Sequence, residues 1–191
     1  MTTVLLFHHA QGQTPGFLAF ADELRGAGHT IHAPDLYDGK TFQDINEGVA
    51  YAGKQVGFQE IIQRGSAAAE GLSDDVVYAG FSLGVMPAQS LAQTRAGLRG
   101  AIFYHGCLPP SEFGGSWPVT VPLQIHMMDA DPWAEEDRPA AEALVEEIDD
   151  AELFLYPGSG HLFADSSLDD YDEKAAGLLK ERTLAFLKRV G

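Results

Sequence analysis

The chain has 191 residues, of which 45% are hydrophobic, enough to bury one core without needing a second domain. Its formal net charge of −16, from 28 acidic and 12 basic residues, argues against nucleic acid and anionic membrane surfaces as partners, because clustered Lys and Arg bind phosphates. The single cysteine, Cys107, excludes an internal disulfide bond, and residues 1–7 lack the basic flank of a signal peptide. We therefore expect a cytoplasmic protein without membrane spans.

Short apolar segments alternate with amphipathic segments along the whole chain. The apolar segments are typical of buried strands, which we predict at residues 4–7, 29–33, 76–79, 101–104, 121–127 and 153–156. Apolar residues at helical spacing predict helices at residues 15–27, 58–72, 85–95, 139–148 and 174–190. This alternation predicts a single α/β domain over residues 1–191, with a mostly parallel, doubly wound sheet flanked by helices on both faces. Sites in such folds form beyond the carboxyl ends of the strands.

The segment Gly80-Phe81-Ser82-Leu83-Gly84 joins the third predicted strand to the third predicted helix. This pattern is typical of a nucleophile elbow, in which a sharp turn exposes the serine hydroxyl and the two glycines leave room for the backbone to fold back. We expect the N–H of Leu83 to stabilise negative charge on a substrate oxygen. The alternative is that Ser82 simply caps the helix that follows.

A serine hydroxyl needs a general base to take its proton and a carboxylate to orient that base. Chains with this elbow carry the acid and then the histidine on loops after later strands. His161 follows the last predicted strand in a Gly-rich loop, and Asp131 follows the strand before it. Asp129 lies on the same loop as Asp131 and is the alternative acid, while His161 could instead be an ordinary loop histidine.

The first predicted strand ends at His8 and His9, where this architecture normally supplies its second oxyanion donor. We expect the N–H of Ala10 or of Gln11 to fill that role. The two histidines have no matching carboxylate or cysteine spacing, so we do not expect them to bind a metal. Side chains near these strand ends either line a substrate pocket or pack within their loops; they are His9, Gln11, Tyr37, Tyr104, Trp133 and Phe163.

These landmarks together resemble the dienelactone hydrolase family, within the α/β-hydrolase fold. The likeness covers nearly all of the chain and rests on the segments Ala33-Pro34-Asp35-Leu36-Tyr37, Gly80-Phe81-Ser82-Leu83-Gly84, Phe103-Tyr104-His105-Gly106, Asp131-Pro132-Trp133 and Gly160-His161-Leu162-Phe163-Ala164. The resemblance implies a cofactor-free ester or lactone hydrolase with a triad of Ser82, Asp131 and His161.

Three positions depart from the family pattern. The family enzymes use a cysteine at the elbow, a glutamate just after the first strand and an arginine directly after the His-x-Phe-Ala segment, where this chain has Ser82, His9 and Asp165. We expect Asp165 to repel a substrate carboxylate, so a small neutral ester or lactone is the predicted substrate. The same triad would also suit a thioesterase or an amidase, and a non-catalytic ligand-binding module is the alternative from another class. The protein is expected to be a monomer or a homodimer.

Overall fold

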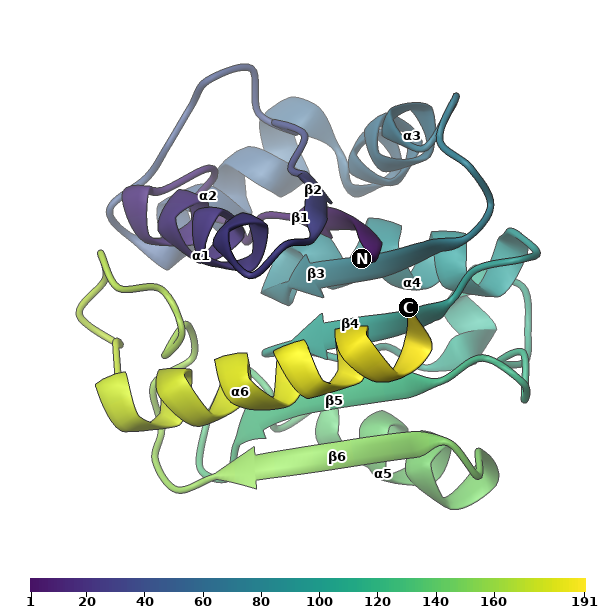
Figure 1. Cartoon of the computed structure of the whole chain (residues 1–191). Helices are drawn as coiled ribbons and strands as arrows, with labels where there is room; N and C mark the ends of the chain where they lie inside the picture. Colours follow the sequence, from purple (N-terminus) through teal and green to yellow (C-terminus); the bar gives the residue numbers. More distant parts are fainter.

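A six-stranded, fully parallel sheet forms the centre of the molecule in the computed structural model, which describes residues 1–191 (Figure 1). Its strands are β1 (Thr3–Phe7), β2 (Thr30–His32), β3 (Val76–Phe81), β4 (Gly100–Tyr104), β5 (Leu123–Met128) and β6 (Ala151–Tyr156). Their order across the sheet is β2-β1-β3-β4-β5-β6, so the chain reverses its direction of progress beside β1. This is the doubly wound α/β arrangement that the sequence predicts.

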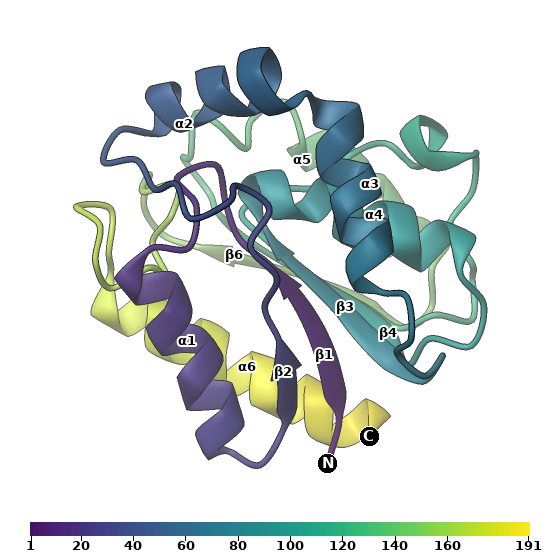
Figure 2. The ribbon, with the colours of Figure 1, turned by 90° about the horizontal axis from the view of Figure 1, so that it is seen from above.

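Helices cover both faces of the sheet (Figure 2). One face carries α1 (Pro15–Gly26) and α6 (Glu173–Val190), and the other carries α3 (Phe58–Ala68), α4 (Val85–Thr94) and α5 (Arg138–Glu147). Alternate residues of each strand point to opposite faces, so Leu5 and Phe7 of β1 join one core cluster while Val4 and Leu6 join the other. Burial on both faces explains why the inner strands β1, β3 and β4 are almost entirely apolar. None of the helices is long and apolar enough to span a bilayer.

All predicted strands and helices are present, with bounds that differ by at most four residues. Sequence analysis missed α2 (Ile45–Tyr51) and the π-helical turn η1 (Ala52–Val56) that continues it. Helix α2 buries only Gly48, so it lacks the apolar periodicity by which helices are predicted. Its start is set instead by Asp44, whose carboxylate accepts the N–H groups of Asn46 and Glu47. Two short 3-10 turns, η2 (Ser82–Gly84) and η3 (Pro110–Phe113), complete the secondary structure.

Candidate active site

Ser82 lies at the tip of the turn between β3 and α4. Its φ angle is +49°, a left-handed conformation that non-glycine residues adopt rarely and at a cost in energy. The turn is tight because a side chain on Gly80 would collide with the backbone of Gly84, and a β-carbon on Gly84 would lie 2.5 Å from the carbonyl oxygen of Phe7. The two glycines therefore allow the turn to pack against the end of β1, with Ser82 partly exposed at its tip.

Three side chains from separate loops form one chain of hydrogen bonds. Ser82 Oγ lies 2.7 Å from His161 Nε2, and His161 Nδ1 lies 2.6 Å from Asp131 Oδ2. The side chains of His161 and Asp131 are 5% and 1% exposed, so water screens their interaction weakly. A carboxylate only accepts hydrogen bonds, so Nδ1 carries the proton and Nε2 is free to accept the Ser82 hydroxyl proton. Such an arrangement can turn the hydroxyl into a nucleophile.

The two candidate acids have different partners. Asp131 Oδ2 contacts the His161 ring, while its Oδ1 accepts the N–H of Trp133 at 2.9 Å. Asp129 Oδ1 instead accepts the N–H of Gly158 at 3.0 Å, which ties the loop after β5 to the loop after β6. The structure therefore brings Asp131, and not Asp129, to the imidazole.

The two candidate oxyanion donors after β1 also differ. The N–H of Gln11 donates to His9 Nδ1 at 3.2 Å, and the Gln11 side-chain amide donates to the carbonyl oxygens of Phe42 and Gln43. The N–H of Ala10 makes no hydrogen bond within the protein. Of the two backbone donors expected here, only that of Ala10 is left for a ligand. Leu83, the other residue whose N–H was expected to act as a donor, lies in η2 directly after Ser82.

Most of the predicted pocket residues pack inside the protein. Trp133 is 44% exposed, and its ring centroid lies 5.9 Å from that of His161. The other predicted residues are buried, namely His9, Gln11, Tyr37, Tyr104 and Phe163. Tyr104 bonds to Thr183 of α6, and Tyr37 packs on His8, so neither presents surface to a substrate. For these two tyrosines the burial supports the alternative of packing within the protein, since Tyr104 ends the covered strand β4 and Tyr37 is enclosed in the loop after β2.

His105 lies close to His161, with their ring centroids 6.0 Å apart. It adopts a φ of +64°, packs edge-on against Phe163, and has no hydrogen-bond partner at either ring nitrogen. Burial lowers the pKa of His105 well below its usual value, and the neighbouring histidines His161 and His9 lower it further. His105 is therefore uncharged at neutral pH. No group of three or more His, Cys, Asp or Glu side chains is arranged to hold a metal ion.

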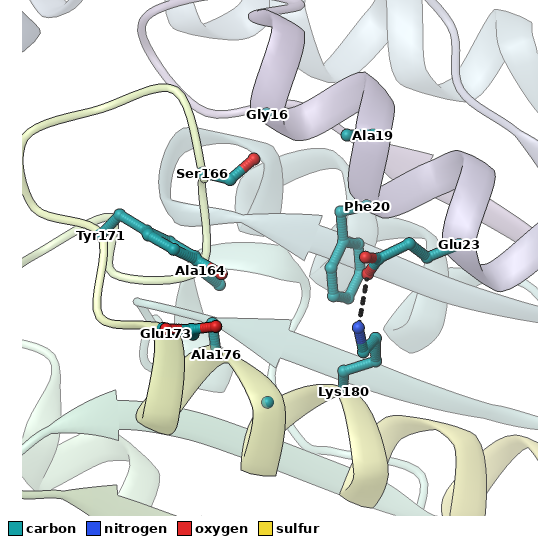
Figure 3. A pocket seen from close by; sticks show the side chains of 11 residues that line it. Gly16, Ala19, Phe20, Glu23, Ala164, Ser166, Tyr171, Glu173, Ala176 and Lys180 are labelled. Atoms are coloured by element: carbon teal, nitrogen blue, oxygen red, sulfur yellow. Dashed lines mark ion pairs between the residues drawn. The ribbon is translucent and has the colours of Figure 1, made fainter.

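A cavity of about 370 Å³ lies between α1 and α6 (Figure 3). An ion pair between Glu23 and Lys180, 3.0 Å apart, crosses it, and Tyr171 and Phe20 contribute aromatic walls. None of its lining residues belongs to the chain of Ser82, His161 and Asp131. The loop that carries His161 contributes Ala164, Ser166 and Tyr171 to the cavity wall, but His161 itself does not line it.

The fold and this geometry can be compared with known proteins. A model of the dienelactone hydrolase family matches residues 1–191. The chain belongs to this family. It is thus a hydrolase of the α/β type. A search of curated proteins found no significant match.

Several solved structures share the fold of this dienelactone hydrolase-family chain. A dienelactone hydrolase-like promiscuous phosphotriesterase from metagenomic libraries is 17% identical, with a TM-score of 0.75, over 100% of this chain and 87% of that one. A putative dienelactone hydrolase from Klebsiella pneumoniae is 20% identical, with a TM-score of 0.75, over 99% and 87%. Esterase 2 from Thermogutta terrifontis, phosphorylated by paraoxon, is 20% identical, with a TM-score of 0.64, over 100% and 83%.

Two departures of this dienelactone hydrolase-family chain from the family pattern are in direct contact. His9 Nε2 lies 2.9 Å from Asp165 Oδ2, and both side chains are fully buried. The expectation that Asp165 faces a substrate carboxylate is therefore wrong, because its oxygens point inward to His9, Thr14 and Ser167. Sequence analysis identified both positions but not their contact. Their contact could have been inferred from the fact that this chain lacks two charged residues of the family pattern at once, with His9 in place of the glutamate and Asp165 in place of the arginine.

Sequence analysis also missed Asp137, at the start of α5. Asp137 Oδ2 accepts the N–H of Cys107 at 3.0 Å and has no cationic partner. A β-carbon on Gly106 would lie 3.1 Å from this oxygen and 3.8 Å from Ser82 Cα, so the carboxylate is close to the elbow. Burial raises the pKa of Asp137, against the lowering effect of its hydrogen bond from Cys107. Nothing in its local sequence distinguishes it from the exposed acids around it.

Proposed function

We propose that this protein is a serine hydrolase that cleaves carboxylic esters or lactones of small, neutral substrates. Ser82 is the nucleophile, His161 is the general base, and Asp131 orients the imidazole. The observation that carries the proposal is the unbroken chain of hydrogen bonds from Ser82 Oγ through the ring of His161 to Asp131. A tight strand-to-helix turn holds the backbone of Ser82 in a left-handed conformation, which supports the same assignment.

The reaction proceeds by acyl transfer. Ser82 Oγ attacks the carbonyl carbon while its proton passes to His161 Nε2, and Asp131 stabilises the imidazolium that forms. The N–H groups of Ala10 and Leu83 donate to the oxyanion of the tetrahedral intermediate. His161 then protonates the leaving alkoxide, which leaves the acyl group on Ser82. In the second half, His161 takes a proton from water as the water oxygen attacks the acyl carbon. It then returns this proton to Ser82 Oγ as the bond between Oγ and the acyl carbon breaks, which releases the acid and restores the free enzyme.

Negative charge near the elbow disfavours anionic substrates. The molecule carries a net charge of −16, and Asp137 places a carboxylate without a cationic partner near the elbow. An anionic acid group on the substrate would be repelled at that position, whereas a neutral ester would not. This charge pattern favours neutral esters and lactones over the carboxylate-bearing lactones from which the family takes its name.

The proposal is tested by replacing the nucleophile. Ser82→Ala should lower kcat/KM for p-nitrophenyl acetate and butyrate by four orders of magnitude or more, because the attacking oxygen is removed. Ser66→Ala, at an exposed site on α3, is the matched control and should retain full activity. A folded Ser82→Ala variant that hydrolyses these esters at the wild-type rate would refute the assignment.

Covalent labelling separates an enzyme from a non-catalytic binding module. One structural neighbour is an esterase phosphorylated by paraoxon, so an organophosphate is a suitable probe. Paraoxon or a fluorophosphonate should modify Ser82 of the wild type, and mass spectrometry of the peptides should place the added mass on that residue. A folded protein that is not labelled, and that hydrolyses none of a panel of esters, thioesters, amides and lactones, would favour the binding module.

A further inference from the structure

The ring of His9 connects two loops through its two nitrogens. Nδ1 accepts the N–H of Gln11 at 3.2 Å, within the turn that follows β1. Nε2 lies 2.9 Å from an oxygen of Asp165, which is four residues after His161 on the loop between β6 and α6. Because a backbone N–H can only donate and a carboxylate can only accept, His9 carries its proton on Nε2. Both nitrogens of the neutral ring are therefore satisfied.

Asp165 is a buried anion held by neutral donors. Burial alone would raise its pKa, but hydrogen bonds from His9, Thr14 and Ser167 outweigh burial and lower the pKa to about 2. The Thr14 hydroxyl donates to Oδ2, while the hydroxyl and N–H of Ser167 donate to Oδ1 at 2.7 and 2.9 Å. His9 stays neutral, since its own burial lowers its pKa and the hydrogen bond to Asp165 only partly offsets that effect.

The same contacts join the start of α1 to the loop that carries His161. Thr14 is the N-cap of α1, and the N–H of Gly16, in the first turn, donates to Ser167 Oγ at 3.0 Å. Gly16 has no side chain because one would collide with Asp165. The segments 9–16 and 161–167 are therefore packed against each other through groups that are satisfied on both sides.

These two segments carry two of the groups that the proposed function requires. Segment 9–16 includes Ala10, the oxyanion donor, and segment 161–167 includes His161, the base. His9 also accepts the N–H of Gln11. The N–H of Ala10, on the same turn, has no acceptor within the protein. His9 itself is unsuited to act as a base, because it is buried and each nitrogen already has a partner.

We infer that His9 and Asp165 are a positioning pair that holds the Ala10 oxyanion turn in register with the His161 base loop. The inference rests on the proposed function. His9 and Asp165, the two residues that depart from the family pattern, therefore act together. They are the two partners of one hydrogen bond, which joins the turn after β1 to the loop between β6 and α6. An error of about 1 Å in such a register lowers the rate about a hundredfold, without requiring any contact between the pair and the substrate.

Amide side chains can test the two ring nitrogens separately. His9→Gln places an amide N–H near the position of Nε2, so it can still donate to Asp165. His9→Asn is shorter; its oxygen can accept the N–H of Gln11 but cannot reach Asp165. Asp165→Asn keeps the shape of the carboxylate, but its NH2 group cannot accept a hydrogen bond, so the donors on one of the two oxygens of Asp165 lose their acceptor. His126→Gln is the matched control, because His126 is equally buried and doubly hydrogen-bonded but lies under α6.

We expect His9→Asn and Asp165→Asn to lower kcat for p-nitrophenyl butyrate by about 10- to 100-fold, with KM changed less than about threefold. His9→Gln should recover most of the lost kcat, and the double variant His9→Asn/Asp165→Asn should lose no more than the worse single variant. His126→Gln should change thermal stability but not kcat per folded molecule. Recovery by His9→Gln is the outcome that a purely structural role does not predict.

The inference is overturned if the folded His9→Asn and Asp165→Asn variants keep the wild-type kcat, or if His9→Gln is as impaired as His9→Asn. Should His9→Asn fail to fold, the same comparison is made between Asp165→Asn and His126→Gln, both measured per folded molecule. Failure of the proposed function itself has a different signature, since Ser82→Ala would then retain activity. Wild-type kcat in the His9 and Asp165 variants, with an inactive Ser82→Ala, would refute the positioning pair alone.

Discussion

Asp131 Oδ2 lies 2.6 Å from His161 Nδ1, and the protein excludes solvent from both side chains. The Asp131→Asn variant should keep the shape of the site but favour the wrong imidazole tautomer, since an amide N–H can face Nδ1. We expect kcat to fall by about four orders of magnitude. Asp129→Asn is the matched control and should reduce kcat less than about tenfold, because Asp129 contacts Gly158 and not the ring. Equal losses in the two variants would contradict the assignment of the acid.

The elbow depends on the absence of a side chain at Gly84. A β-carbon there would lie 2.5 Å from the carbonyl oxygen of Phe7 and 2.7 Å from that of His8, and backbone cannot move away as a flexible side chain can. We expect Gly84→Ala to lower the free energy of unfolding by roughly 2–4 kcal/mol, measured by urea denaturation. Gly177→Ala in α6 meets no atom within 4 Å and should instead stabilise by about 0.5–1 kcal/mol. An elbow variant as stable as wild type would show that the turn is less crowded than described.

Buried histidines should make the protein labile to mild acid. Burial lowers the pKa of His8 to about 4 and that of His126 to about 3. Between pH 6.5 and these values the unfolded chain binds more protons than the folded one, so stability falls as pH falls through that window. Each histidine contributes a slope of up to about 1.4 kcal/mol per pH unit. Urea denaturation from pH 7.5 to 4 should show this decline, and His126→Gln should have a shallower one; an unchanged slope would contradict the explanation.

Asp137 should affect the pH dependence of stability in the opposite direction to the buried histidines. Burial raises its pKa in the folded protein, so the folded chain binds more protons above pH 3.8 and stability falls as pH rises through the window up to the raised pKa. Asp137→Asn keeps an oxygen for the N–H of Cys107 and removes the charge. It should raise the free energy of unfolding at pH 7, because the charged carboxylate that burial disfavours is removed. The gain should disappear near pH 3, and Glu136→Gln, at the exposed neighbouring position, should show no gain at either pH.

Much of the fold could be predicted because its signals are local. Buried parallel strands are largely apolar, and the helices between them repeat apolar residues every three to four positions, so both are visible in short windows. Helix α2 lacks this signal because it buries only a glycine, Gly48, against the backbone of Ala10. Its position depends on a close approach between distant segments, which composition does not reveal.

The sequence by itself determined the doubly wound sheet, the elbow at Ser82 and the order of its partners, because glycine spacing and strand ends place these groups at one edge of the sheet. Tertiary structure alone decided between Asp131 and Asp129, left the N–H of Ala10 rather than that of Gln11 for a ligand, and joined His9 to Asp165 across 156 positions of the chain. The physical reason is that a hydrogen bond requires an ångström-scale position and a direction. Both are set by how loops from different parts of the chain pack together.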